Sequence, residues 1–258
     1  FATGESNTVS GAGSVAMGLG NTVTSPNSGI ALGQFNTVSG SYSLAIGQSN
    51  IASGNHALSI GNIDTANGSY SQALGIGNYA YSYGEFVAGS YAARYTPTSA
   101  TTFDRRDRIF SIGIGTGSAT ANRSNAFTIL KNGRSGFNTT TPAARVDVNG
   151  DIALRQKTLT LATGANSDIT AVDTMTFYRI TGPTGAFNVT GFTGGVDGRV
   201  LILYNTTTQP MTITNLATSG AANQINTLSA NLVTVGEGSV TLTYDATSSK
   251  WIVLSFTP

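Results

Sequence analysis

The sequence predicts an all-β fold, because it combines a glycine repeat with a period of about 14 residues, a shortage of charged residues and a C-terminal run of short alternating segments. Of the 258 residues, 10% are charged and 32 are glycines. A typical globular domain has about 25% charged residues, and coiled coils have more. The composition therefore excludes a helical bundle or coiled coil and argues against an ordinary α/β enzyme.

The glycine repeat occupies residues 1–93. Each of its glycines after the first closes a short run such as SVAMG or SLAIG. An Asn or Asp follows shortly afterwards, and then a second short run such as NTVSG. One interval has 15 residues instead of 14, and it contains Pro26 and Asn27, where a turn can take up one extra residue. The repeated glycines are Gly4, Gly18, Gly33, Gly47, Gly61, Gly75 and Gly89.

A repeat of this length restricts the structure to strands. Each unit holds two runs of alternating character between Gly, Asn and Ser turns, which is typical of strands. Fourteen residues are too few for a helical hairpin, but they suffice for one coil of a β-solenoid with two strands. Stacked coils would rise by the strand spacing of about 4.8 Å. A single coil exposes its backbone and apolar face, so we expect only the stack to be stable.

Two columns of the repeat predict packing on both faces of one strand. A column here means the equivalent position in successive repeats. The column that contains Ala16 has small side chains in every unit, and the column that contains Met17 has mostly large aliphatic ones. A two-strand coil has room for few interior side chains, so we expect one face to fill the coil and the other to pack against a neighbouring subunit. The alternative is a monomeric solenoid with an apolar face. The predicted packing residues are Ala16, Met17, Ala31, Leu32, Ala45, Ile46, Ile60, Ala73 and Leu74.

The motif [S/G]-x-A-x-G-x-x-N at this spacing resembles the head repeat of trimeric autotransporter adhesins, the YadA-like heads. The resemblance covers roughly residues 1–91 and implies a left-handed parallel β-roll that forms a homotrimer. Similar rolls occur in phage fibres and other bacterial surface fibres. Tyrosines gather in the last repeats, which suggests the end of the roll. The chain starts within a repeat, so we expect the roll to continue upstream in a longer fibre or parent chain.

Residues 94–157 form a basic segment that we interpret as a collar. It carries ten Lys or Arg and four Asp, a net charge of +6, whereas residues 1–93 carry no Lys or Arg. Asn132-Gly133 predicts a hairpin, and Asn149-Gly150 a second turn. The passage resembles a junction found in bacterial surface fibres and phage tail fibres. Because opposite charges alternate, we expect inter-subunit ion pairs rather than a nucleic-acid site, from Asp104, Arg105, Arg106, Asp107 and Arg108.

Residues 158–258 are predicted to form a β-sandwich or jelly-roll-like tip domain. Short alternating runs are separated by turn signals such as Gly182-Pro183 and Asp197-Gly198. The segment resembles distal domains of phage tail-fibre proteins. The predicted strands are Thr158–Leu161, Met175–Ile180, Arg199–Tyr204, Met211–Thr214, Leu232–Val235, Ser239–Tyr244 and Lys250–Ser255.

Residues suited to catalysis are scarce. The chain has no cysteine and one histidine, His56, which we place at a solvent-facing turn, so neither a transition-metal site nor a cofactor is expected. Glycoside hydrolysis needs two carboxylates about 5–9 Å apart. The pairs Asp104/Asp107, Asp147/Asp151 and Asp168/Asp173 do not lie in a stretch typical of a sugar cleft. No apolar run reaches the roughly 18 residues of a membrane-spanning helix, so membrane insertion is not expected.

These observations favour a non-catalytic trimeric fibre that attaches to a cell surface, glycan or protein receptor. The first hypothesis is an extracellular tail fibre of a phage or phage-like particle, joined upstream to a baseplate or longer fibre. The alternatives are a bacterial surface adhesin or filament subunit and a glycan-degrading tail spike. The predicted receptor-binding loop of the tip contains Phe187, Asn188, Phe192 and Asp197. Its aromatic rings could stack on a sugar, or they could plug the end of the sandwich or the trimer axis.

Overall fold

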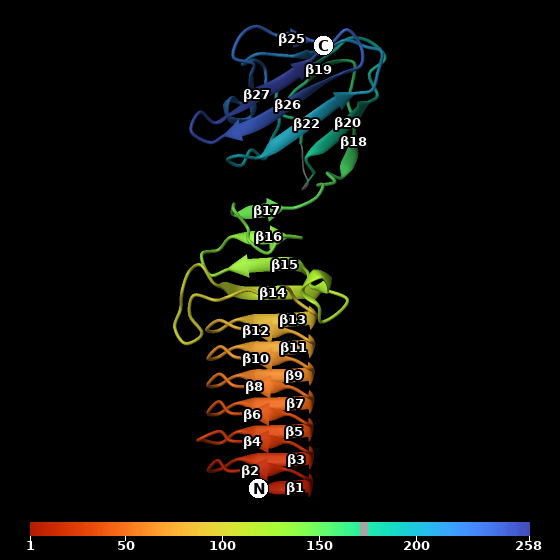
Figure 1. The fold of residues 1–258 in the computed structure, drawn as a ribbon. Coiled ribbons are helices and arrows are strands. Elements are labelled where there is room, and N and C mark those ends of the chain that lie inside the picture. Colours follow the sequence, from red (N-terminus) through yellow and green to blue (C-terminus); the bar gives the residue numbers. More distant parts are fainter. Residues whose placement is uncertain (171–174) are drawn as a thin grey trace. The chain divides into compact units, whose positions relative to one another are not determined.

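The computed structural model describes residues 1–170 and 175–258, which form two compact units, Phe1–Ile152 and Ala153–Pro258 (Figure 1). Both units are built from strands, which confirms the all-β class. Two short 3-10 turns, η1 (Thr120–Asn122) and η2 (Ala221–Asn223), are the helical elements of the described ranges. The expected junction at 93/94 does not interrupt the first unit, because residues 94–152 continue its main sheet.

The first unit contains one long sheet and one short sheet. The long sheet has 11 strands, of which the first eight are parallel. Its strands are β1 (Ala2–Glu5), β3 (Val15–Leu19), β5 (Ile30–Gln34), β7 (Leu44–Gln48), β9 (Leu58–Asn62), β11 (Gln72–Ile76), β13 (Phe86–Ser90), β14 (Arg108–Ile114), β15 (Asn125–Leu130), β16 (Ser135–Phe137) and β17 (Val146–Val148).

The second sheet takes one short strand from each repeat. Its six strands are all parallel, so the chain alternates between the two sheets and returns to each in the same direction. This confirms the prediction of two strands per repeat. The strands are β2 (Thr8–Val9), β4 (Thr22–Val23), β6 (Thr37–Val38), β8 (Ile51–Ala52), β10 (Thr65–Ala66) and β12 (Tyr79–Ala80). The extra residue of the 15-residue interval lies between β4 and β5, as Pro26 predicted.

The repeated glycines pair directly with one another from strand to strand, and the backbone explains why they are glycines. Gly47 has φ of +117°, a region that residues with a side chain rarely adopt. A Cβ atom there would lie 2.1 Å from the carbonyl oxygen of Gly61 on the next strand. Both the dihedral angle and the close backbone approach therefore require glycine.

Small side chains fill the space between the two sheets. The predicted small column of the long sheet is fully buried and faces the apolar column of the short sheet. Alanine and valine allow the two sheets to approach closely around a shared core. The buried cluster includes Ala16, Ala31, Ala45, Ala73 and Val87 of the long sheet, and Val23, Val38, Ala52, Ala66 and Ala80 of the short sheet.

A ladder of buried polar side chains follows the long-sheet strands. Asn36 illustrates its bonding: Nδ2 donates to Asn21 Oδ1 at 3.0 Å, to the Leu32 carbonyl at 3.0 Å and to the Gly47 carbonyl at 2.9 Å. Each rung thus links neighbouring repeats and satisfies carbonyls that the turns would otherwise leave unpaired. The sequence predicted only turn residues at these positions. The ladder consists of Asn7, Asn21, Asn36, Asn50, Asp64 and Asn78.

Asp64 is the exception in this ladder. Its Oδ1 accepts a hydrogen bond from the Asn78 backbone N–H at 2.6 Å, but its Oδ2 is buried and has no hydrogen-bond partner among the described residues. In the asparagines of the ladder, the equivalent position is occupied by the side-chain N–H₂ group, which donates hydrogen bonds. Burial raises the pKa of Asp64 from its ordinary 3.8 to about 6. A protonated carboxyl would restore the missing donor.

The collar extends the long sheet beyond the glycine repeat. β14 pairs with β13 in the same register as the repeats, with Gly89 opposite Gly113. The sequence did not predict this strand, because residues 91–107 separate it from β13. β15 then runs antiparallel to β14, and β15 and β16 form the hairpin predicted at Asn132-Gly133.

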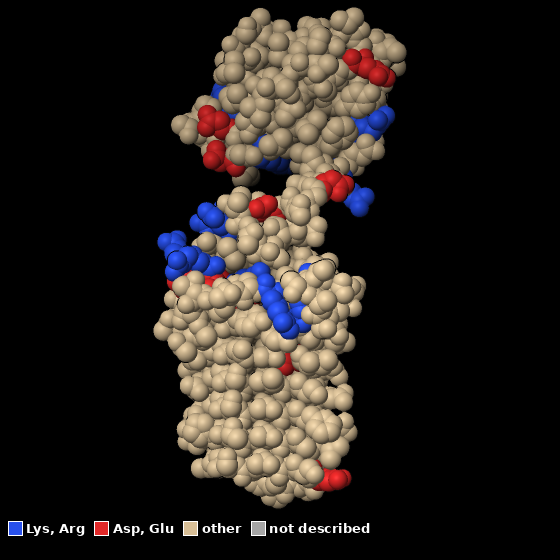
Figure 2. All heavy atoms as spheres, in the orientation of Figure 1, with Lys and Arg blue, Asp and Glu red and all other residues tan. Residues whose placement is uncertain are grey.

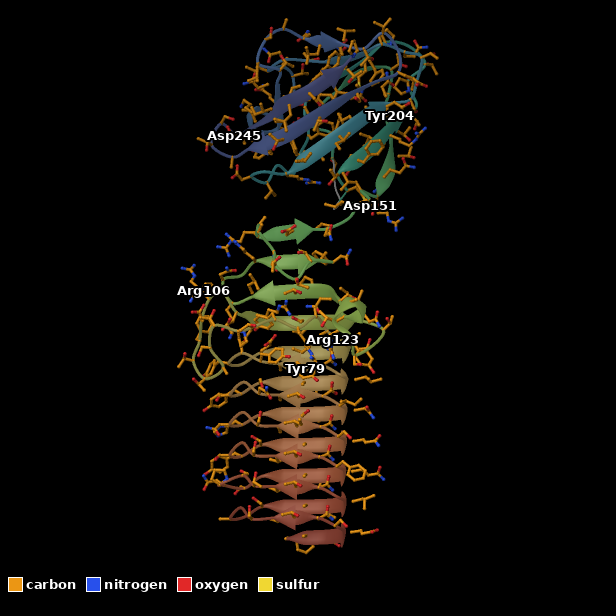
Figure 3. All side chains as sticks on the ribbon, in the orientation of Figure 1. Tyr79, Arg106, Arg123, Asp151, Tyr204 and Asp245 are labelled. Atoms are coloured by element: carbon orange, nitrogen blue, oxygen red, sulfur yellow. The ribbon has the colours of Figure 1, made fainter. Side chains whose placement is uncertain are left out.

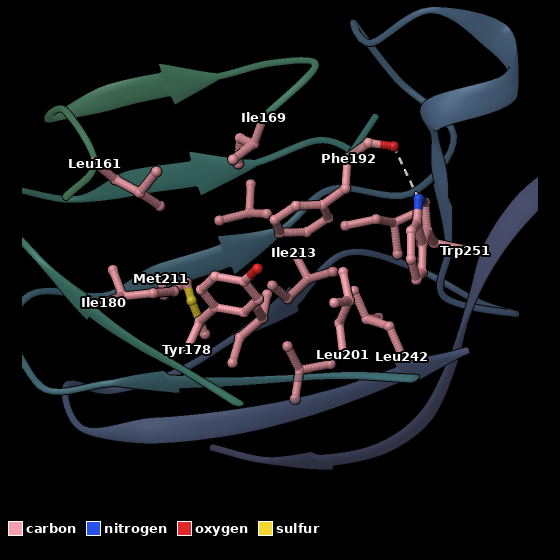
Figure 4. Packing of buried hydrophobic residues seen from close by; sticks show 14 of the residues in the cluster. Leu161, Ile169, Tyr178, Ile180, Phe192, Leu201, Met211, Ile213, Leu242 and Trp251 are labelled. Carbon is pink, nitrogen blue, oxygen red and sulfur yellow. Dashed lines mark hydrogen bonds between the residues drawn. The ribbon is translucent and has the colours of Figure 1, made fainter. Parts of the chain in front are cut away.

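The second unit is a two-layer structure around one apolar core (Figure 4). All seven predicted strands overlap observed ones, whereas β19, β21 and β24 were missed. One sheet has six strands, β18 (Gln156–Thr160), β20 (Phe177–Thr181), β22 (Val200–Asn205), β26 (Gly238–Asp245), β27 (Lys250–Thr257) and β24 (Ile225–Asn226). The other has four, β19 (Gly164–Asn166), β21 (Phe187–Val189), β23 (Met211–Ile213) and β25 (Leu232–Val233).

The jelly-roll-like pairing expected for this unit is wrong. Jelly rolls are antiparallel, but β18, β20 and β22 pair in parallel, and so do β19, β21 and β23. The reason is that the chain alternates between the sheets and returns to each in the same direction. In the second unit, the antiparallel pairs among the described strands are β22 with β26, β26 with β27, and β23 with β25.

Candidate interaction surfaces

The outer face of the long sheet carries two apolar columns. The predicted large column lies here, opposite to the buried alanines: Met17 is 43% exposed, and Leu32, Ile46, Ile60 and Leu74 are partly exposed. The structure thus divides the predicted packing residues into two groups. The alanines are buried inside the unit, and the large aliphatic residues are the ones available to another chain.

The second outer column continues into the collar as a series of aromatic rings. In the repeats it consists of Val15, Ile30, Leu44, Leu58, Gln72 and Phe86. Phe86 of β13 stacks on Phe110 of β14, with ring centroids 5.5 Å apart. Phe110 then contacts Phe127 of β15, and Phe127 contacts Phe137 of β16. From Phe86 onward this column is therefore aromatic through the collar, whereas the exposed Gln72 interrupts it within the repeats.

One turn of the stack carries a second series of rings. Tyr42, His56 and Tyr70 occupy equivalent positions of successive repeats, each with a positive φ near 60°. His56 lies 5.2 Å from Tyr42 and 4.7 Å from Tyr70, centroid to centroid, and all three side chains are exposed. The prediction that His56 lies at a solvent-facing turn is confirmed. The stacking was not foreseen, although tyrosines at 14-residue intervals on either side of it were a signal.

The alternating charges of the collar have partners within the chain. Arg106 forms an ion pair with Asp104 at 2.9 Å, and its hydrogen bonds lower the pKa of Asp104 to about 2. The buried Asp107 accepts hydrogen bonds from the backbone N–H groups of Thr98 and Ser99. These carboxylates hold the 94–107 loop together. The inter-subunit ion pairs predicted for them are therefore not needed to satisfy their charges.

Arg108 is likewise engaged inside the chain. It is only 4% exposed; its guanidinium lies over the Tyr95 ring and donates to the Ala93 carbonyl at 2.6 Å. Arg105 and Arg106 are the exposed members of the predicted set, but Arg106 already pairs with Asp104, so the inter-subunit expectation still stands for Arg105. Alternation in the sequence could not distinguish buried loop anchors from surface charges.

A buried carboxylate lies beneath the collar. Glu85 Oε2 accepts hydrogen bonds from the N–H groups of Tyr81 and Ser82 and from the Tyr95 hydroxyl, all near 3 Å. Burial raises the pKa of Glu85, and the charge of Arg108 partly opposes this. Nearby, Arg123 covers the Tyr79 ring (Figure 3) and donates to the carbonyls of Gly77 and Ala92. Glu85 Oε2 and the Arg123 guanidinium thus have structural partners within the chain, whereas the buried Glu85 Oε1 has no hydrogen-bond partner among the described residues.

The predicted receptor-binding loop is corrected at its two aromatic residues. Phe187 and Phe192 are 1% and 0% exposed and belong to the core of the second unit. Figure 4 shows Phe192 within this core. Phe187 opens β21, and the Phe192 carbonyl accepts a hydrogen bond from Trp251 Nε1 at 2.9 Å. Glycine-rich surroundings suggested a loop, but the rings plug the two-layer core. Asn188 and Asp197 are exposed, and Asp197 accepts a hydrogen bond from the Ala246 backbone.

Several of the carboxylates considered for hydrolysis have hydrogen-bond partners within the chain. Asp104 and Asp107 have the partners given above, Asp147 accepts from the Ala143 N–H, and Asp168 accepts from Gly220 and Asn223. Asp173 lies outside the described residues. Within the described ranges, no three His, Cys, Asp or Glu side chains gather as metal ligands.

Comparisons with protein-family models, curated proteins and solved structures found no match to this chain. None of the helices in residues 1–170 and 175–258 is long and apolar enough to cross a membrane.

Proposed function

We propose that the chain is a segment of a non-catalytic homotrimeric fibre that attaches to a cell surface or glycan. In this proposal the first unit is a left-handed parallel β-roll, and the second unit is a distal binding domain. The fibre is extracellular. Three copies of a weak binding site on one fibre give avidity without a strong single site.

One observation carries the proposal: the outer face of the long sheet is largely apolar, with Gln72 and Thr3 as polar interruptions of its two columns. Met17, Leu32, Ile46, Ile60 and Leu74 lie in one column, and the phenylalanine series extends a second column through the collar. Soluble monomers rarely expose continuous apolar patches of more than a few hundred Å². Three such faces related by a threefold axis would cover one another in a closed assembly.

The carrier that we favour is the tail of a phage or phage-like particle. The sequence of a repeat stack, a basic collar and a two-layer C-terminal unit supports it, together with the resemblance of the collar and the C-terminal unit to fibre proteins. The 14-residue motif equally supports an adhesin or filament subunit of the trimeric autotransporter type, which is the second candidate. A particle-docking segment or a membrane anchor in the parent chain would separate the two.

The mass of the purified chain in solution tests the trimer. Light scattering should give a species near three times 26.4 kDa, stable to moderate heating. A stable monomer would overturn the trimeric fibre, and the apolar columns would then need a different partner chain.

A further inference from the structure

The collar contains two adjoining hollows lined by arginines. The larger, about 360 Å³, is lined by Arg106, Arg108 and Arg134 together with Tyr95, Leu130 and Pro142, among others. The smaller, about 260 Å³, is lined by Arg105, Arg134 and Arg145 with Asn132 and two alanines. Arg134 and Ala143 belong to both. Figure 2 shows Lys and Arg side chains gathered over this end of the first unit.

The positive charge of these hollows is not neutralised by their own lining. Within the described part of the chain, neither hollow is lined by a carboxylate. Asp104 pairs with Arg106 and so balances one arginine of the larger hollow, and the buried Glu85 lies within reach of the charge of Arg108. Arg105, Arg134 and Arg145 form no ion pair among the described residues, so their charges remain available. The collar therefore offers cationic side chains around a concave surface.

The larger hollow is more than a patch of surface charge. Arg108 is buried and fixed by the Ala93 carbonyl and the Tyr95 ring, so its guanidinium is held in place before any ligand arrives. Fixed guanidinium groups bind carboxylate and phosphate groups through paired hydrogen bonds. The volume is within the range of small-ligand pockets, and Tyr95, Leu130 and Pro142 supply an apolar lining.

We propose that the collar hollows bind the anionic groups of an acidic cell-surface glycan. Arg134 lines both hollows, so it would contact anionic groups in both, while Arg105 and Arg106 flank it. Apolar and hydroxyl side chains beside the arginines suit a sugar ring that carries a carboxylate. Nucleic acid is disfavoured because it needs an extended basic track, and residues 1–93 provide no Lys or Arg to continue one.

The biological meaning of this site rests on the proposed attachment function, but anion binding by the hollows does not. The first measurement is binding of the full chain to polygalacturonate, with neutral dextran as the uncharged control. We expect saturable binding to polygalacturonate, competition by free galacturonate, and no binding to dextran.

Arg134→Gln and Arg155→Gln form a matched pair, because both remove one exposed arginine, and Arg155 lies in the second unit. Arg134→Gln should weaken polygalacturonate binding about tenfold or more, since it removes charge-assisted hydrogen bonds. Arg155→Gln should change it less than twofold. Equal weakening by both variants would overturn the site in favour of general charge attraction, and so would a lack of polygalacturonate binding. Unchanged circular dichroism of both variants shows that they fold.

Binding of a third ligand, a single-stranded oligonucleotide, distinguishes a glycan site from a nucleic-acid site. If a single-stranded oligonucleotide binds more tightly than polygalacturonate and its binding is the one sensitive to Arg134→Gln, the acidic-glycan assignment is overturned. Light scattering on the same samples keeps the two proposals apart. A trimer that fails to bind polygalacturonate overturns the collar site alone, whereas a monomer that binds it overturns the trimeric fibre alone.

Discussion

At the residue scale, Asp64 differs from its ladder neighbours by one atom, an oxygen in place of an N–H₂ group. The three acceptors that an asparagine donates to at the other rungs are here the Asn50 side-chain oxygen and the carbonyls of Ile60 and Gly75, by register. Asp64 Oδ1 accepts a hydrogen bond from the Asn78 backbone, but Oδ2 has no hydrogen-bond partner among the described residues, and an ionised carboxylate is unfavourable in such a buried site. Burial is the main cause of the raised pKa of Asp64, about 6, and hydrogen bonds from Asn78 partly oppose it.

We predict that this residue makes the first unit less stable as the pH rises. The pKa of Asp64 is about 6 in the folded chain and near 3.9 when unfolded. Between these values the unfolded state binds fewer protons, so the free energy of unfolding falls with rising pH and levels off above the folded pKa. The total loss is on the order of 3 kcal/mol. Denaturant unfolding from pH 4 to 8 measures it.

The matched variant is Asp64→Asn, which restores the donor with almost no change of shape. It should be more stable than the parent chain at pH 7, by up to about 3 kcal/mol, and about equally stable at pH 4. Because Glu85 also has a raised pKa, the difference between parent and variant isolates Asp64. A difference that does not change with pH would contradict the argument.

The repeated glycines lead to a second residue-scale prediction. Gly47→Ala should destabilise the first unit by about 3 kcal/mol or more, because it combines an unfavourable φ with a clash against the Gly61 carbonyl. Gly84→Ala is the control, since its φ is also positive but an added Cβ would lie 3.9 Å from its nearest neighbour, Ile109 Cδ1. Thermal unfolding of the two variants should show the larger loss at Gly47; equal losses would mean that strain alone matters.

At the scale of elements, the outer face of β7 offers a test of the apolar columns. Ile46→Asp should leave the single chain folded, because the side chain is partly exposed, yet it should break the assembly by placing a charge in an apolar interface. Gln48→Asp on the same strand is the control at an exposed position. Light scattering should give a single-chain mass for Ile46→Asp and the parent mass for Gln48→Asp. Loss of circular dichroism in Ile46→Asp would place Ile46 in the core instead.

The elements also show what the sequence could and could not predict. The glycine period predicts six strand pairings in register, because in a parallel stack each residue pairs with the residue one repeat further along the chain. β14 follows the same pattern, but its distance from β13 concealed it. In the second unit, the parallel pairing was missed because its strands recur at unequal intervals of 21 and 25 residues, from Gln156 to Phe177 to Ile202.

The candidate sites were harder to predict than the fold. The large outer residues of the repeats follow from alternation, which also places the alanines inside. Phe187 and Phe192 were misread because a strand of three residues between glycines has the same composition as a loop. The collar hollows were not predicted at all, since Arg108 and Arg134 lie far apart in sequence and are joined only through the pairing of β14, β15 and β16.

At the scale of the whole molecule, the two units have separate cores. The only tryptophan of the chain, Trp251, is fully buried in the second unit, where it contacts Phe192 and Tyr244. Its fluorescence therefore reports unfolding of that unit, whereas far-ultraviolet circular dichroism reports both.

We expect Asp64→Asn to raise the temperature of the circular-dichroism transition that belongs to the first unit at pH 7. The transition followed by Trp251 fluorescence should not move. If both signals shift together, the units unfold as one cooperative body and the division at residues 152/153 has no thermodynamic meaning.

The register of the stack also has a genetic consequence. Each repeat pairs with the next through the same few contacts, and the one extra residue between β4 and β5 shows that a change of length is absorbed within a turn. In-frame duplication or loss of fourteen codons would therefore add or remove one rung and leave every other rung unchanged. The reach of such a protein can evolve in steps of about 4.8 Å by recombination between its own repeats, without any new packing solution.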